Sequence, residues 1–217
     1  ESYQGVQQRR ASGVTAWVTI QRGCDHRCTF CIVPYVRGPE KNRRPEEVLA
    51  EVRGLVAGGV SEVTLLGQTV NSYRHGGWAF PRLLREVARV PGVRRVRFTS
   101  PHPIDVTAEL VHVMASEDAV CEQLHLPLQS GSDEVLRRML RRYSVSAYLE
   151  TVAMVRESVP DVAISTDVIV AFPGETEGDF EAMAARLLEG DPATNARRVR
   201  TRFNQLGLSA RELRDGR

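Results

Sequence analysis

The sequence of 217 residues contains no apolar run near the ~20 residues that a membrane-spanning helix needs. It also opens without the basic and apolar segments of a secretory signal. Cysteine is scarce, at four residues, and a disulfide-stabilised fold is disfavoured because nothing in the sequence indicates export. These absences predict a protein without a membrane segment that works in the reducing cytoplasm.

Lysine is almost absent: Lys41 is the only one, and the other basic residues are arginines. With 29 basic and 27 acidic side chains the formal net charge is only +2, so overall charge does not by itself predict nucleic-acid binding. The arginine bias has two interpretations: a compositional bias of the genome, or a surface for phosphates, whose oxygens match the guanidinium fork. Composition alone leaves both open.

Three of the four cysteines lie within eight positions, at Cys24, Cys28 and Cys31. The β-branched segment 14–20 predicts a strand, so the cysteines follow its C-terminal end, where α/β proteins place their chemistry. Three thiolates on one loop favour an iron–sulfur cluster over zinc, because a closed zinc site wants four ligands and His26 has little room to reach the same metal. Zinc and accidental cysteines remain alternatives. We expect Cys121, in an apolar run, to lie in the core.

Strand and helix patterns alternate along the chain. Predicted strands cover 14–20, 62–66, 93–98, 121–126 and 162–170. Helical patterns, punctuated by proline and glycine, cover 45–57, 81–90, 106–115, 132–141, 146–158 and 176–188. This alternation predicts parallel βα units joined by right-handed crossovers. The predicted fold class is therefore α/β, a partial barrel of about five βα units whose loops share one rim.

The same pattern divides the chain into three parts. Residues 1–13 are polar and aperiodic and are interpreted as a leader or linker, whereas 14–189 form the α/β core. Residues 190–217 form an arginine-rich, atypical tail, helical in part, without a sixth strand. The length suits one sizeable domain, which we expect to be part of a longer protein.

The triad Cys24-x3-Cys28-x2-Cys31, with Phe30 just before the third cysteine, resembles the cluster motif of radical S-adenosylmethionine (SAM) enzymes. In that family the three cysteines bind a [4Fe–4S] cluster, the fourth iron takes the amino and carboxylate groups of SAM, and the aromatic residue lies near the adenine. The resemblance implies both cofactors here, with an electron from the cluster cleaving SAM to a 5′-deoxyadenosyl radical. It also implies the family's (β/α)6-type barrel.

Further stretches, all at or just after predicted strand ends, resemble the methylthiotransferases within that family. They comprise 31–38, 65–68, 97–103, 125–132 and 172–176. The similarity is greatest to the branch that converts N6-isopentenyladenosine at tRNA position 37 to its 2-methylthio form. It implies a sulfur-inserting transferase with tRNA as substrate and a reductant protein such as flavodoxin or ferredoxin as partner.

Members of that branch also carry an N-terminal domain with a second cluster, implicated in sulfur delivery, and a C-terminal RNA-binding TRAM domain. Neither resembles any stretch of these 217 residues, so we expect complete methylthiolation to need segments beyond this core. Two local departures are Thr69, where the family usually has asparagine, and Ala171, where it usually has glycine.

The resemblance implies SAM contacts at five positions, which are Phe30, Gly67, Gln68, Gln129 and Ser130. The residues themselves add Thr166 and Asp167, within the fifth predicted strand, as further candidates for the cofactor. A simple glycine turn with an exposed amide remains the alternative for Gly67 and Gln68, and a helix cap is the default role of Ser132. Asp167 lies in an otherwise apolar strand, so its carboxylate should be paired or face a ligand.

Other polar residues near the predicted rim could meet the substrate. Arg37, Arg43 and Arg44 could contact its phosphates or form a solvated basic loop. His102 and His125 could face the substrate or be hydrogen-bonded core histidines.

Three competing functions remain open from sequence. A related enzyme class, which methylthiolates an aspartate of a ribosomal protein, shares the cysteine triad. A zinc-stabilised RNA-binding module without catalysis would use the cysteines structurally. An inactive truncated product would bind SAM weakly and melt without cooperativity.

Overall fold

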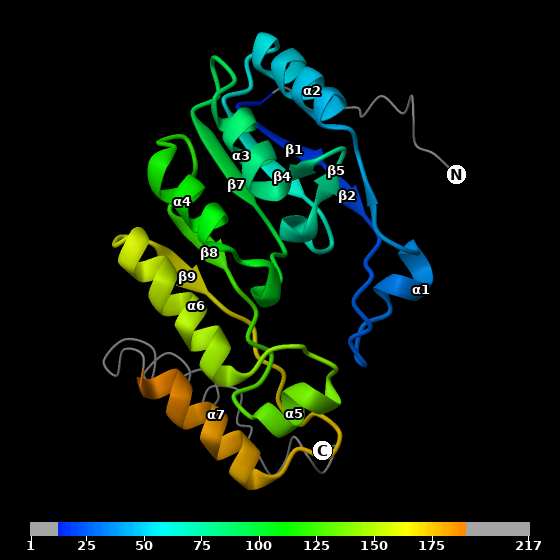
Figure 1. Ribbon diagram of the computed structural model, residues 1–217, viewed down its shortest axis with the longest axis vertical. Coiled ribbons are helices and arrows are strands. Elements are labelled where there is room, and N and C mark those ends of the chain that lie inside the picture. Colours follow the sequence, from blue (N-terminus) through cyan, green and yellow to red (C-terminus); the bar gives the residue numbers. More distant parts are fainter. Residues whose placement is uncertain (1–12, 190–217) are drawn as a thin grey trace.

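The computed structural model describes residues 13–189, with side chains through Met183. The leader expected at 1–13, apart from Gly13, and the tail expected at 190–217 lie outside the described residues. Five parallel strands run through the described part in chain order, and at least one helix follows each (Figure 1). The α/β class and the five βα units are therefore confirmed.

The sheet begins with three parallel strands in the order β1-β4-β7. They span Thr15–Thr19, Glu62–Leu66 and Arg95–Phe98. A second parallel pair, β8 (Gln123–His125) with β9 (Ala163–Ser165), joins the first three through a single bridge between Val96 and Val120. Because β1, β4, β7, β8 and β9 pair only in parallel, their C-terminal ends lie along one rim.

Helices follow the strands and pack against one another, α2 on α3, α3 on α4, and α4 on α6. The longer ones are α2 (Pro45–Ala57), α3 (Phe80–Ala88), α4 (Ala108–Ser116), α6 (Val145–Ser158) and α7 (Glu177–Glu189). The short ones are α1 (Val33–Arg37), α5 (Asp133–Arg138) and the 3-10 turns η1 (Val70–Ser72) and η2 (Pro103–Asp105). Side-chain oxygens of Thr107, Ser132 and Ser144 accept hydrogen bonds at the starts of α4, α5 and α6.

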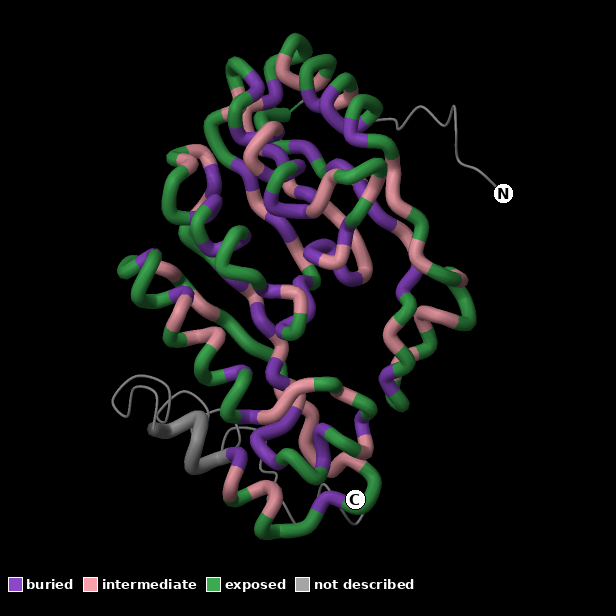
Figure 2. Tube along the Cα trace, in the orientation of Figure 1, coloured by how far each residue is buried: buried purple, intermediate pink, exposed green. Residues whose placement is uncertain are grey.

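Alternation along the strands gives the sheet an apolar face and a polar face. On the apolar face, side chains such as Val18 and Leu65 are fully buried and form a continuous core with the helices (Figure 2). On the other face Trp17 is 58% exposed, and Glu62 accepts a hydrogen bond from Arg97 (3.1 Å). The helix-facing side therefore holds the fold together, and the opposite side carries polar side chains.

Several short elements were not predicted. The segment after the cysteines contains α1, and β2 (Gln21–Arg22) pairs antiparallel with β3 (Lys41–Asn42). A second small hairpin, β5 (Arg74–His75) with β6 (Trp78–Ala79), lies in the loop after β4. Strands of two residues leave no periodic pattern in a sequence, so these pairs were invisible there.

The fifth strand is shorter than the predicted 162–170. It ends at Ser165, and parallel pairing resumes only at a bridge between Gln129 and Val168. Cys121, expected in the core, is only half-buried, so that prediction is wrong. Within residues 13–189, no helix combines the length and apolar character that crossing a lipid bilayer demands.

Candidate functional site

The cysteine loop, residues 23–32, leaves β2 through a turn that only glycine fits. Gly23 has a φ of +76°, and a Cβ there would lie 2.1 Å from the carbonyl oxygen of Pro39. The next N–H, from Cys24, donates to the carbonyl of Gly38 (3.2 Å). The start of the loop is therefore fixed against the residues that lead into β3.

The other end of the cysteine loop is held by the segment after α5. The N–H of Thr29 donates to the carbonyl of Met139 (3.2 Å), and its hydroxyl donates to the carbonyl of Arg138 (3.1 Å). The second of these bonds joins residues 109 positions apart. The loop thus links the first βα unit to the fourth.

The three cysteines are free thiols that differ in exposure: Cys24 and Cys28 are buried, and Cys31 is half-buried. The sulfur of Cys24 lies 3.2 Å from the Thr69 hydroxyl, and a guanidinium nitrogen of Arg141 lies 3.4 Å from the sulfur of Cys28. Burial raises the pKa of the Cys24 thiol, although the Thr69 hydroxyl acts in the opposite direction. The net effect raises the pKa of Cys24, and its thiol must lose its proton when a metal binds, because the thiolate is the ligand.

The three thiols are not gathered around one point in this structure. In the described part of the chain, one group of three potential ligand atoms lies within 4.8 Å of one another, and it consists of His26, His102 and Asp105 without any cysteine. Three cysteine thiolates on one loop are the kind of donor set that holds an iron–sulfur cluster.

The close group of His26, His102 and Asp105 is held together by ring stacking. The two imidazole rings are parallel within 4°, with centroids 4.1 Å apart, and the Asp105 carboxylate lies 3.6 Å from Nε2 of His26. Metal-binding lone pairs lie in the plane of an imidazole ring, so two stacked rings cannot both point at one ion. The stack instead joins the cysteine loop to the loop after β7.

His102 is a buried neutral imidazole with a defined tautomer. The Asn71 side-chain amide donates to its carbonyl (2.8 Å) and accepts from its N–H (2.7 Å). Nδ1 of His102 accepts from the N–H of Ile104 (3.3 Å), which leaves the ring proton on Nε2. Burial lowers the pKa of His102 to about 2, and the nearby positive charge of Arg141 adds to this effect.

The loop after β4 is held by Gln21. This fully buried side chain accepts from the N–H of Thr69 (2.9 Å) and donates to the hydroxyl of Ser72 (2.8 Å). Gly67 packs on the same amide, since a Cβ there would lie 2.7 Å from the Gln21 side-chain oxygen. The side-chain oxygen of Gln68 is buried and has no hydrogen-bond partner within the described residues. Such an unpaired acceptor is available to a ligand's donor group.

The loops after β8 and β9 are bonded to each other through Gln129. Its φ is +71°, its N–H donates to the carbonyl of Asp167 (2.9 Å), and its carbonyl accepts from the N–H of Ile169 (2.8 Å). Ser130 is fully buried, and its hydroxyl oxygen accepts from the N–H of Ser132 (3.2 Å). Both predicted site residues therefore shape this loop.

Thr166 and Asp167 serve different neighbours. The Thr166 hydroxyl oxygen accepts from the N–H of Leu128 (2.9 Å) and from the Tyr148 hydroxyl (3.3 Å). The Asp167 carboxylate is 69% exposed and lies 3.2 Å from Nε2 of His125. Asp167 is thus paired, as expected of a carboxylate there, and still open to solvent.

The remaining candidates lie at the outer side of the cysteine loop. The side chains that stay exposed there are those of Phe30, Arg37 and Arg44. Arg43 instead donates to the carbonyl of Thr19 (2.8 Å) and pairs with Glu51 of α2 (2.6 Å). The Arg43 guanidinium is therefore bonded to groups of the protein itself, unlike those of the exposed Arg37 and Arg44.

Several residues of the site were missed by sequence reasoning. They are Gln21, Asn71, Arg141 and Tyr143. Gln21 carried one weak signal, a polar side chain directly after an apolar strand. For the others no signal exists, because their contacts join segments that are distant in the sequence.

Comparison with known proteins shows similarity over most of the chain. A family model described as the radical SAM superfamily matches residues 18–187. A tRNA-2-methylthio-N(6)-dimethylallyladenosine synthase of Parafrankia sp. (strain EAN1pec) is 59% identical over 175 residues, which are 79% of this chain and 35% of the relative. The synthase of the same name from Desulfosudis oleivorans is 53% identical over 182 residues, 83% of this chain and 39% of the relative. The chain thus spans little more than a third of these curated relatives.

Solved structures share the fold at low sequence identity. The radical SAM methyltransferase TsrM from Kitasatospora setae, solved with cobalamin and a [4Fe-4S] cluster, aligns with a TM-score of 0.68 at 20% identity, covering 83% of this chain and 38% of that one. Coproporphyrinogen III oxidase (HemN) from Escherichia coli aligns with a TM-score of 0.55 at 17% identity, covering 80% and 41%. From the family match over residues 18–187 and this shared fold, the chain belongs to the radical SAM superfamily.

Proposed function

We propose that this chain is the catalytic core of a radical SAM methylthiotransferase that converts N6-dimethylallyladenosine (N6-isopentenyladenosine) at position 37 of tRNA to its 2-methylthio form. The observation that carries the proposal is the 59% identity over 175 residues to a relative named for this product. The family match over residues 18–187 includes the cysteine loop and the rim loops described above. Relatives named for the tRNA reaction favour it over the ribosomal-protein alternative.

The cysteine loop fits a [4Fe–4S] cluster with Cys24, Cys28 and Cys31 as its ligands. Their free thiols supply the donor chemistry that such a cluster requires. The buried, unpaired oxygen of Gln68 fits the amino group of SAM beside the cluster. When both are bound, the cluster and SAM would supply one-electron reductive cleavage of a carbon–sulfur bond of SAM.

Other rim residues would complete the SAM site. The exposed ring of Phe30 offers a stacking surface, and the Asp167 carboxylate can accept from ribose hydroxyls. Gly67 lets the backbone of its loop approach Gln21 closely. The remaining members, Gln129, Ser130 and Thr166, act by shaping the loops that carry these contacts.

Two further side chains condition the site. Arg141, anchored by a bond of 3.0 Å to the Tyr143 hydroxyl, keeps a positive charge beside the sulfur of Cys28. His102 stays neutral at physiological pH, so its Nε2–H can donate to a substrate group without bringing a charge into the site.

The proposed reaction needs partners and a compartment. We propose tRNA as the substrate, with the exposed Arg37 and Arg44 available to its phosphates. A reductant protein such as flavodoxin or ferredoxin would supply the electron. Free thiols and a cluster of this kind suit the reducing cytoplasm.

The test is SAM cleavage by anaerobically reconstituted chain in the presence of two synthetic anticodon stem-loop RNAs. One carries N6-dimethylallyladenosine at position 37 and the other carries adenosine. We expect the first RNA to increase the release of 5′-deoxyadenosine more than the second, measured by mass spectrometry, with 2-methylthio product in the digested RNA when the missing segments of the relatives are supplied. Equal rates with both RNAs, or stimulation by a ribosomal-protein peptide alone, would contradict the assignment.

A further inference from the structure

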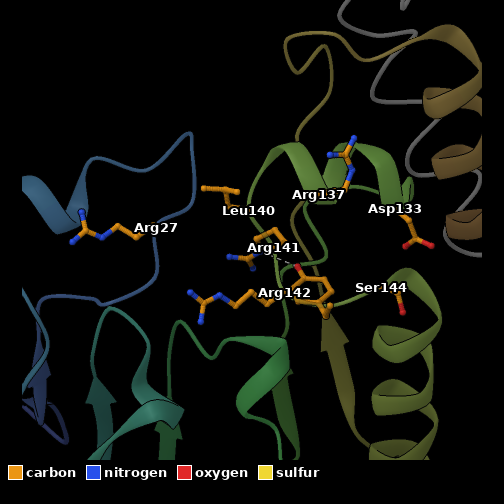
Figure 3. A pocket seen from close by; sticks show the side chains of 8 residues that line it. Arg27, Asp133, Arg137, Leu140, Arg141, Arg142 and Ser144 are labelled. Atoms are coloured by element: carbon orange, nitrogen blue, oxygen red, sulfur yellow. Dashed lines mark hydrogen bonds between the residues drawn. The ribbon is translucent and has the colours of Figure 1, made fainter.

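A basic cavity of about 550 Å³ opens beside the cysteine loop (Figure 3). Its charged lining consists of Arg27, Asp133, Arg137, Arg141 and Arg142. Arg27 lies on the cysteine loop at one side of the cavity, and its guanidinium points away from the others in Figure 3; the other four come from α5 and the turn that follows it. Four guanidinium groups against one carboxylate make the cavity a site for an anion.

Two of the four arginines are fixed by partners. Arg137 makes a two-pronged contact with the Glu134 carboxylate, at 2.6 and 3.1 Å. Arg141 donates to the Tyr143 hydroxyl (3.0 Å) and contacts the sulfur of Cys28 (3.4 Å). Arg137 is thus paired at the surface of α5, whereas Arg141 is held on the side of the cavity next to Cys28.

The other two arginines have uncompensated charge. Arg27 and Arg142 are exposed, and in the part of the chain that the structure describes neither has a carboxylate partner. The one carboxylate in the lining, Asp133, is already used, because it accepts from the N–H of Val145 at the start of α6 (2.7 Å). Leu140, with a φ of +56°, forms the turn that brings the following arginines into the lining.

We propose that this cavity binds a backbone phosphate of the substrate RNA, with Arg27 and Arg142 as the contacting groups. The inference rests on the proposed function, because it names where that substrate is held. Both side chains are exposed, so the Arg27 guanidinium can swing toward a phosphodiester that Arg142 contacts from the other wall, while the RNA chain leaves to solvent. Arg141 lines the same cavity and contacts Cys28, so a phosphate held here lies close to the cysteine loop.

The experiment measures RNA binding by fluorescence anisotropy, with iron-loaded chain and no reductant, so that turnover is not required. The test variant is Arg27→Ala/Arg142→Ala. The matched control is Arg53→Ala/Arg156→Ala, which removes the same charge from exposed positions on α2 and α6. The probe is an anticodon stem-loop RNA, with and without N6-dimethylallyladenosine.

We expect the test variant to bind both RNAs about tenfold more weakly and to reduce the slope of log K against log salt by about one to two, while the control keeps wild-type values. Arg27→Lys/Arg142→Lys should keep most of the slope, and a wild-type iron content will show that each variant is folded. The affinity for SAM should not change.

Three results would overturn the inference. Equal RNA affinity in the test and control variants would show that the cavity does not hold the backbone. Loss of SAM affinity in the test variant, with RNA binding intact, would assign the cavity to the cofactor's carboxylate. A wild-type chain that binds neither RNA would remove the proposed tRNA substrate together with this inference, whereas the first two results leave that substrate standing.

Discussion

On the helix-facing side of the sheet the buried side chains are almost all apolar, whereas the rim above the strands buries polar ones. The core side is represented by Val18, Val63 and Leu65, none of which is exposed. The rim buries polar side chains that are each hydrogen-bonded to neighbouring residues, namely Gln21, Thr69, Asn71, His102 and Ser130. Apolar burial stabilises the fold without direction, while hydrogen-bonded burial fixes particular atoms in place.

Backbone strain follows the same division. In the described residues, the non-glycine positions with positive φ are Ser100, Gln129, Leu140 and Ala171. All four lie outside the named strands and helices, and Gln129 also forms the isolated parallel bridge to Val168. Strained backbone of this kind persists where surrounding contacts over-determine it, often at functional sites. The apolar core therefore supplies the stability that offsets the cost of strained backbone in the rim loops.

The largest stability effect should come from the core. Leu65→Ala empties a fully buried site and should lower the free energy of unfolding by about 3 kcal/mol. Leu66→Ala, one residue on and facing the other side of the sheet, should cost about 1 kcal/mol because that residue is only half-buried. Urea unfolding of both variants checks this, and equal losses would break the distinction between the two faces.

Substituting a buried polar residue of the rim should lower the free energy of unfolding less than Leu65→Ala does, but it should impair iron binding more. Gln21→Leu leaves the buried N–H of Thr69 without its acceptor and should lower the free energy of unfolding by about 2 kcal/mol. It should also reduce the iron retained after reconstitution, because Thr69 touches Cys24. Gln123→Leu, an exposed glutamine on β8, is the control and should leave iron retention unchanged.

The buried neutral state of His102 should appear in the pH dependence of stability. Because its pKa falls from 6.5 to about 2 on folding, the unfolded chain binds a proton between these values that the folded chain does not. This group therefore lowers the free energy of unfolding as the pH falls below 6.5, by about 1.4 kcal/mol at pH 5.5. His102→Gln should remove that part of the slope between pH 7.5 and 5.5, whereas the exposed His112→Gln should not. Identical slopes in the two variants would mean that His102 is protonated in the fold.

The smallest effect has the opposite sign. Ala171 holds a φ of +57°, where glycine is unstrained, so Ala171→Gly should raise the free energy of unfolding by about 0.5 kcal/mol. Ala153→Gly, in the exposed middle of α6, should lower it by about 1 kcal/mol. Thermal unfolding of the two variants shows whether each substitution raises or lowers the stability. A loss in both would show that Ala171 is not strained.

The sequence was sufficient for the order of strands and helices because punctuation and periodicity are local signals. Pro45 opens α2, serines cap α5 and α6, and alternating apolar residues mark the strands. Elements shorter than a period, such as α1 and the hairpin of β2 with β3, could not be predicted on that basis. The limit is physical, since pairing of two residues is decided by the chain around it.

The candidate site was predictable in part. The cysteine triad and Gln68 stand out as motifs, but their surroundings depend on contacts across the fold. The stack of His26 on His102 and the bond between Thr29 and Arg138 join loops of different βα units, and no pattern within one segment encodes them. Arg43 illustrates the converse: a basic residue beside the cysteine loop that the fold uses internally, in its pair with Glu51 of α2.

The central claim is that the rim holds an iron–sulfur cluster able to cleave SAM, and the most direct measurement is iron, sulfide and zinc per chain after anaerobic reconstitution, followed by SAM and reductant. The account predicts about four irons with matching sulfide and release of 5′-deoxyadenosine, all lost in Cys28→Ala and retained in a Cys121→Ala control. One colourless zinc ion per chain, or a coloured protein that leaves SAM intact, would contradict it.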